Sequence, residues 1–163
     1  MNLGIPEGDW SLYDVDDRSP TIHIPEVLDE CLAALTDRFD QTKSDLARNA
    51  LMLHVHGRRV FEALVAAKLW RLKRRVQAED SRKFSLQGTR LRSQDSPRKS
   101  YIAAFGKSVV ELKVWMPSPL HDRLSSLAIA LELTPAEYMR RALTAYYLGR
   151  LALDPFDGRD VEF

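Results

Sequence analysis

The most concentrated chemical function in this chain is positive charge, gathered in its middle part. Residues 58–99 carry 13 basic and 4 acidic groups, whereas residues 1–57 carry 4 basic and 11 acidic ones, and the whole chain has a net charge of +1. A basic block of this kind is either a solvated linker and helix face or an electrostatic surface for a polyanion. The candidate anion-contacting residues in it are Arg71, Lys73, Arg74, Arg75, Arg82 and Lys83.

Other reactive arrangements are missing from the sequence. His54 and His56 are two positions apart, so on a helix they would point to different faces and could not share one metal ion. The chain has no glycine-rich phosphate loop, no nucleophile elbow and no His-Glu-x-x-His motif. We therefore expect a protein that is not an enzyme and that binds no metal and no cofactor.

Polar and apolar side chains alternate in two short segments, which is typical of strands with one buried face. In the first segment, residues 21–24, Ile22 and Ile24 share one face and Thr21 and His23 share the other. In the second segment, residues 110–116, the inward set is Val110, Leu112, Val114 and Met116, and the outward set is Glu111, Lys113 and Trp115. Each strand is followed by a proline, which can end a strand and open a helix.

These two strands begin two copies of one longer unit, offset by 92 residues without a gap. Ten positions are identical between residues 25–58 and 117–150, where unrelated segments would share roughly two. The identical positions in the first copy are Pro25, Leu28, Leu32, Leu35, Thr42, Arg48, Ala50, Leu51, Gly57 and Arg58. A unit of about 40 residues is too small to bury a core alone, so the two copies should complete one another.

Each copy continues with two predicted helices. Leucines spaced four and three positions apart give the first helix a single apolar stripe. A threonine followed three positions later by an acidic residue (Thr42 and Asp45, Thr134 and Glu137) predicts the start of the second helix. Gly57 and Gly149 stand where the C-terminal caps would lie.

The succession of strand, helix, tight turn and helix resembles the ribbon-helix-helix superfamily, the Arc, MetJ and CopG type of DNA-binding protein. The resemblance covers residues 19–58 and 111–150, and we expect the two copies to span 19–58 and 108–151. It rests on the hydrophobic-Pro strand end, the leucine stripe and the helix signature Thr-x-[Ser/Ala]-[Asp/Glu]-x-x-Arg-x-Ala-Leu. The tandem form resembles the TraY-type relaxosome proteins and the T-DNA-processing accessory protein of tumour-inducing plasmids. It implies a mainly α fold with a short two-stranded antiparallel ribbon, built as a pseudo-dimer within one chain.

The resemblance also implies which residues would contact double-stranded DNA. The outward strand residues would read bases in the major groove: Thr21 and His23 from the first copy on one side of the ribbon, and Glu111, Lys113 and Trp115 from the second copy on the other, with a pseudo-twofold axis relating the two strands. The starts of the second helices would hold phosphates through Thr42, Lys43, Ser44, Thr134 and Ala136. The leucines Leu32, Leu35, Leu124 and Leu127 are expected to meet across that axis.

The remaining segments have weaker patterns. We predict an acidic N-terminal arm (1–18), packed by its aromatic residues or disordered, a connector helix (59–79), a basic linker (80–107) and an acidic C-terminal tail (152–163). A single cysteine, Cys31, and the lack of a secretory signal or an apolar run long enough for a membrane span favour a cytoplasmic protein without membrane contact.

Three biological roles fit a DNA-binding protein of this kind. It could be an accessory factor in plasmid or T-DNA processing and transfer, a transcriptional regulator or antitoxin, or a partition-type repressor. A relaxase or a partition ATPase is then a candidate partner, and the chain is expected to be a monomer that can assemble further on DNA. A fourth interpretation keeps the fold but makes it a protein-interaction scaffold that has lost DNA binding.

Overall fold

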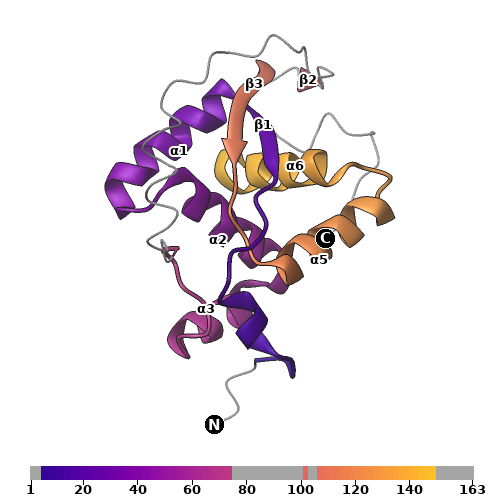
Figure 1. The fold of residues 1–163 in the computed structure, drawn as a ribbon. Coiled ribbons are helices and arrows are strands. Elements are labelled where there is room, and N and C mark those ends of the chain that lie inside the picture. Colours follow the sequence, from indigo (N-terminus) through magenta and orange to yellow (C-terminus); the bar gives the residue numbers. More distant parts are fainter. Residues whose placement is uncertain (1–4, 75–100, 103–105, 150–163) are drawn as a thin grey trace.

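The computed structural model describes residues 5–74, 101–102 and 106–149. Its elements in chain order are η1 (Trp10–Tyr13), β1 (Thr21–Pro25), α1 (Glu26–Phe39), α2 (Lys43–His56), α3 (Arg58–Ala66), β2 (Tyr101–Ile102), β3 (Gly106–Lys113), α5 (Ser118–Ala130) and α6 (Pro135–Leu148). The described part is mainly helical and contains one small antiparallel sheet of order β1-β3-β2 (Figure 1). The predicted fold class, mainly α with a short antiparallel ribbon, is confirmed.

The two repeated strands pair with each other inside one chain. Strand β1 runs antiparallel to β3, and Thr21 lies opposite Lys113, its own counterpart in the repeat. Beyond the end of β3, a bridge joins Arg18 to Met116. This bridge is the repeat counterpart of the pair Ile24–Val110, so the ribbon extends to both sides of a centre at Thr21–Lys113.

The second helices of the two copies start as predicted. The Thr42 side chain accepts from the backbone N–H of Asp45, and the Asp45 side chain accepts from the backbone N–H of Thr42, which completes a capping box. In the other copy the Thr134 side chain accepts from the backbone N–H of Glu137, and Pro135 occupies the first turn. Both caps satisfy N–H groups that a helix start leaves without an intrahelical partner.

The helix ends match between the copies as well. Gly57 (φ 79°) and Gly149 (φ 85°) end α2 and α6 with positive φ, a conformation that favours glycine. Asp40 (φ 52°) and Glu132 (φ 58°), which are also counterparts at the offset of 92, turn the chain after α1 and α5. The repeat seen in the sequence is therefore also a repeat of backbone conformation.

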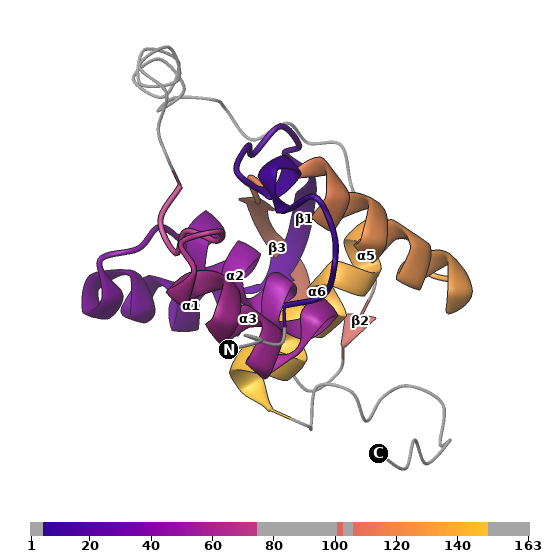
Figure 2. The same ribbon diagram turned by 90° about the horizontal axis from the view of Figure 1, so that it is seen from below.

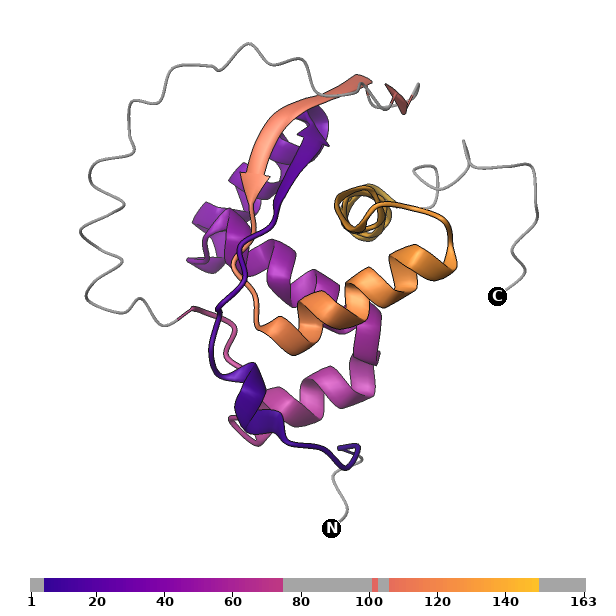
Figure 3. The same cartoon turned by 45° about the vertical axis from the view of Figure 1, so that its right-hand side comes forward.

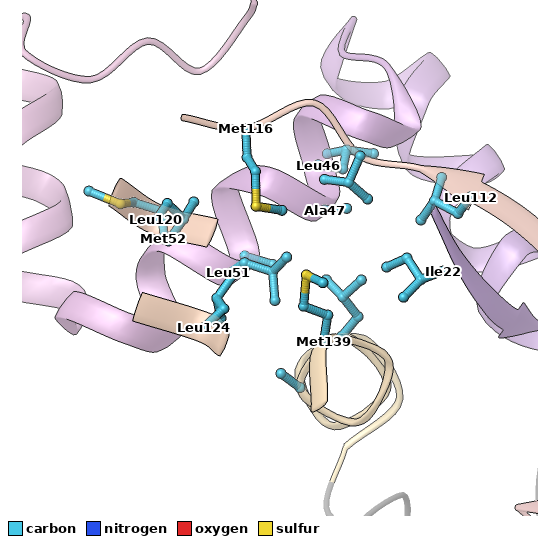
Figure 4. Close-up of a cluster of buried hydrophobic side chains, with 14 of the residues drawn as sticks. Ile22, Leu46, Ala47, Leu51, Met52, Leu112, Met116, Leu120, Leu124 and Met139 are labelled. Atoms are coloured by element: carbon cyan, nitrogen blue, oxygen red, sulfur yellow. The ribbon is translucent and has the colours of Figure 1, made fainter. Parts of the chain in front are cut away.

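One core joins the two copies. Helices α2 and α6 contact each other, and both are contacted by α1 and by α5. Figure 4 shows Ile22 and Leu112 from the ribbon directed toward Leu51 of α2, Leu124 of α5 and Met139 of α6. Because residues from both copies fill the same buried cluster, neither copy has a core of its own.

The leucine stripes are buried over only part of their length. Leu32 and Leu124 are fully buried, whereas Leu35 and Leu127 are half-buried. The expectation that all four meet across the axis is not met, because α1 and α5 pack on α2 and α6 rather than on each other.

The N-terminal arm packs on the core through Ile5, Trp10 and Tyr13. Its short helix η1 contacts α5, and Figure 2 shows it beside the start of that helix. The Trp10 and Tyr13 rings lie edge-on to the His56 ring of α2, with centroids 5.5 Å and 5.8 Å away. Tyr13 also contacts Trp70 at 6.4 Å between centroids. The aromatic residues of the arm thus attach it to α2 and to the segment after α3.

The connector helix is shorter than predicted. We expected it over 59–79, but α3 ends at Ala66, and Lys68 turns the chain with a φ of 59°. The backbone N–H groups of Leu69 and Trp70 then donate to the Leu64 carbonyl at 2.9 Å and 3.2 Å. The chain therefore reverses toward α2, and Arg71, Lys73 and Arg74 do not lie on a helix. We call residues 67–74 the return segment.

Parts of the predicted linker and tail can also be placed. Strand β2 and the first two residues of β3 fall within 80–107, so the linker is shorter than predicted at its C-terminal end. Residues 80–100 and the predicted tail at 152–163 lie outside the described residues. Within the described residues, no helix has the length and apolar character needed to span a bilayer.

Candidate nucleic-acid interface

The outer face of the ribbon carries the side chains that the sequence placed there. Thr21, Glu111 and Lys113 are exposed, and His23 and Trp115 are half-buried. The alternate residues of β1, β3 and the residues just after β3 form the buried inner face (Ile22, Ile24, Leu112, Val114 and Met116), and Val110 is half-buried against the same core. Figure 3 shows β1 and β3 side by side at the upper margin, with α2, α5 and α6 below them. The inward and outward sets of the prediction are confirmed.

The register between the strands sets how these residues are arranged about the ribbon centre. Thr21 of β1 and Lys113 of β3 face each other as the central pair. His23 lies opposite Glu111 at one end of the ribbon, and Trp115 lies at the other end, between the paired residues Val114 and Met116. The antiparallel register, rather than the order of the strands in the chain, decides which of these residues share an end.

Trp115 is held by contacts on several sides. The Arg74 guanidinium lies over its ring at 4.1 Å from the centroid, and the Lys113 ammonium lies 4.9 Å from the same centroid. The Trp115 backbone N–H donates to the Ser44 hydroxyl at 2.8 Å. This end of the ribbon is therefore attached to the start of α2 and to the return segment.

The two predicted phosphate-binding helix starts have different surroundings. At α2, Lys43 forms an ion pair with Asp29 at 2.6 Å, and the Ser44 hydroxyl accepts from the ribbon. At α6, Thr134 caps the helix, Pro135 has no N–H to offer, and Ala136 is half-buried. The side chains at the start of α2 are thus already engaged within the protein, and the start of α6 lacks the N–H group of Pro135.

Three cations of the return segment, Arg71, Lys73 and Arg74, are paired with carboxylates of the first 57 residues. Arg71 contacts Asp14 at 3.2 Å, and Lys73 donates a short hydrogen bond to Asp40. The Arg74 guanidinium lies 3.7 Å from the carboxylate of Asp16. These pairs lower the charge that this part of the basic block presents to a polyanion. Of the other predicted phosphate contacts, Arg75, Arg82 and Lys83 lie outside the described residues.

Arg48 lies at the centre of this ion-pair network. Its side chain is only 3% exposed and contacts Asp16 at 2.5 Å and Asp45 at 3.3 Å. It also donates to the carbonyls of Arg71 and Leu72 at 2.9 Å and 3.3 Å. Burial raises the pKa of the Asp16 carboxyl, and the Arg48 and Arg74 charges oppose that rise. Arg48 thus joins the arm, α2 and the return segment.

The two histidines of α2 contact different groups, as their spacing predicted. His54 lies 2.7 Å from the Tyr138 hydroxyl of α6, and His56 lies 3.4 Å from the Tyr13 hydroxyl. Burial lowers the pKa of His54, and burial together with the Arg123 charge lowers the pKa of His56. Both contacts connect α2 to other parts of the chain and lie apart from the outer face.

Sequence reasoning missed the network formed by Asp16, Arg48 and Arg74. The one available signal was that Arg48 and Arg140 are identical in the repeat, and both are buried beside the acidic residue of the preceding turn. Comparisons with protein-family models, with curated proteins and with solved structures found no match for this chain.

Proposed function

We propose that this chain is a sequence-specific double-stranded DNA-binding protein of the ribbon-helix-helix type, with both halves of the pseudo-dimer in one polypeptide. The observation that carries the proposal is the antiparallel pairing of the two repeated strands about Thr21 and Lys113, which leaves their outer face exposed. A two-stranded ribbon fits the B-DNA major groove, which is about 12 Å wide.

The outer face has the chemistry needed to distinguish base pairs. The Lys113 ammonium can donate to the O6 and N7 acceptors of guanine, and the Thr21 side chain can contact several bases or a thymine methyl group. The Glu111 carboxylate repels phosphates but can accept from the amine of cytosine. Because Thr21 and Lys113 occupy the centre, both would lie over the middle of the site.

Phosphate contacts would supply most of the affinity and fix the protein on the duplex. The candidates among described residues are the starts of α2 and α6, with the hydroxyls of Thr42 and Ser44 and the ammonium of Lys43 nearby. Lys43 is already paired with Asp29, so it has to exchange that partner for a phosphate. We expect fewer phosphate contacts from the return segment than its number of cations indicates.

The proposed biological role is an accessory factor in plasmid or T-DNA processing and transfer, or a transcriptional regulator. It rests on the tandem form of the repeat, since a single chain that carries both halves can bind without forming a dimer first. The genes beside its own would separate the roles. A relaxase or partition ATPase gene favours transfer or segregation, and a toxin gene favours an antitoxin.

Selection from a random duplex library should enrich an asymmetric site of a few base pairs. A symmetric homodimer reads a palindrome, whereas the two ends of this ribbon carry unlike side chains, His23 with Glu111 at one end and Trp115 at the other. The measurement is sequencing of the bound pool after several rounds at moderate salt. If nothing is enriched, sequence reading is excluded, and a protein-interaction scaffold becomes the better description of this fold.

A further inference from the structure

The Trp115 end of the ribbon is connected to a segment that lies outside the repeat. Arg74, at the end of the return segment, places its guanidinium 4.1 Å from the centroid of the Trp115 ring. Lys113, the central cation of the outer face, lies 4.9 Å from the same centroid. The Trp115 ring thus contacts both Lys113, which is a candidate base-reading residue, and Arg74, which follows α3.

Arg74 is itself held in place. Its side chain is only 12% exposed, and its guanidinium lies 3.7 Å from the Asp16 carboxylate of the arm. Its backbone N–H donates to the Asp45 carboxylate of α2 at 2.9 Å. A cation enclosed in this way is poorly placed to extend to a phosphate, whereas its planar group can fix the orientation of the ring that it covers.

The opposite end of the ribbon has different chemistry. The repeat counterpart of Trp115 is His23, which lies opposite Glu111. The Trp115 end therefore combines an indole with the Arg74 cation and adjoins the central Lys113, whereas the other end combines an imidazole with a carboxylate. The return segment belongs to neither copy of the repeat, so Arg74 adds to the asymmetry that the strands already have.

We propose that Arg74 is a positioning residue of the reading surface, which holds Trp115 in one orientation and thereby restricts Lys113. This inference rests on the proposed function and assigns part of its sequence specificity to the return segment. A lysine side chain has four flexible methylene groups, and its immobilisation on binding costs free energy. A Trp115 ring that is fixed beside Lys113 limits the conformations of the lysine side chain before DNA binds. Less free energy is then lost when the Lys113 ammonium is immobilised against its base.

The test compares Arg74→Lys and Arg74→Gln with Arg71→Lys as a matched control. Arg71 lies in the same segment and also pairs with a carboxylate, but its side chain is 41% exposed, and the cations that lie over the Trp115 ring are Arg74 and Lys113. The chain has three tryptophans, so each variant gives three indole N–H signals in an NMR spectrum, and Trp115→Phe identifies the one from Trp115. DNA binding is measured by titration on the selected duplex and on duplexes with single base changes.

In Arg74→Lys, we expect the Trp115 indole signal to shift and the preference for the base pair at Lys113 to fall about threefold to tenfold. The slope of log affinity against log salt should stay unchanged in Arg74→Gln, since a lost phosphate contact would lower it by about 0.9. Arg71→Lys should leave the indole signal and the preference as in the wild type.

The failures of the two proposals are distinguishable. A wild-type protein that binds no duplex overturns the proposed function, and the specificity role falls with it. A wild-type protein that reads DNA while Arg74→Lys leaves the indole signal and the preference unchanged overturns the positioning role alone. A slope lowered by about 0.9 in Arg74→Gln also overturns it, because Arg74 then contacts a phosphate directly.

Discussion

Leu124→Ala should lower the free energy of unfolding by about 2–5 kcal/mol. Leu124 of α5 is fully buried in the cluster that contains residues from the ribbon, α2 and α6 (Figure 4). Truncation removes apolar contacts and leaves a cavity that the packed surroundings fill only in part. Its repeat counterpart Leu32 of α1 is buried to the same extent, so Leu32→Ala should cost a similar amount. Chemical denaturation followed by circular dichroism measures both.

The matched control is Leu131→Ala, since Leu131 is 61% exposed and should change stability by less than about 0.5 kcal/mol. Both core variants should unfold in one transition, because the two copies share a single core. A cost below about 0.5 kcal/mol at both Leu32 and Leu124 would contradict the shared core. Two separate unfolding transitions, with each variant affecting only one of them, would also contradict the shared core.

Arg48→Met should lower the free energy of unfolding by about 3–5 kcal/mol at neutral pH. The substitution keeps the apolar stem but removes a buried guanidinium that contacts Asp16 and Asp45. It leaves the Asp16 carboxylate in a site where burial already raises its pKa. The matched control is Arg59→Met, since Arg59 is exposed on α3.

The pH dependence of this variant has a definite sign. Loss of the guanidinium removes the charge that opposes the rise in the pKa of Asp16, so that pKa rises further in the folded state. A folded state that binds its proton more tightly than the unfolded state gains stability as the pH falls. The deficit of Arg48→Met should therefore be smaller at pH 5 than at pH 7. Adding Asp16→Asn to Arg48→Met should restore part of the lost stability. Equal deficits of Arg48→Met at pH 5 and pH 7 would contradict the network.

The elements of the repeat could be predicted because each one has a local signal. Alternation placed Ile22 inside and Thr21 outside, and the threonine at position 42 marked the start of α2. Glycines at 57 and 149 marked helix ends because their positive φ favours a residue without Cβ. Two copies in register made these local signals agree, which is why the ribbon and its four helices were found.

The return segment could not be predicted because its turn has no sequence signal. Lys68 adopts the left-handed conformation that usually marks glycine, so the apolar periodicity suggested that α3 continued. What ends the helix is tertiary: Trp70 is buried, and its indole N–H donates to the Asn49 side chain of α2 at 2.9 Å. The pairing of the basic residues with Asp14, Asp16 and Asp40 follows from that reversal.

The candidate site was predictable in its membership but not in its arrangement. The outward set was correct, since strand alternation alone determines it. The position of Lys113 at the ribbon centre depends on the register between β1 and β3, which a single strand pattern does not specify. The stacking of Arg74 on Trp115 depends on the reversal of the chain after α3, so it could not be predicted from the sequence.

Titration of Lys113→Ala on the selected duplex tests most directly whether the ribbon reads DNA. The variant should lose about 1–3 kcal/mol of binding free energy at the preferred site and lose its preference for the base pair there. Its fold should be unchanged because Lys113 is exposed. The control Arg59→Ala removes one charge from α3, which lies at the far end of the molecule from the ribbon (Figures 1 and 3), and should keep the preference. Wild-type affinity and wild-type preference in Lys113→Ala would contradict the account.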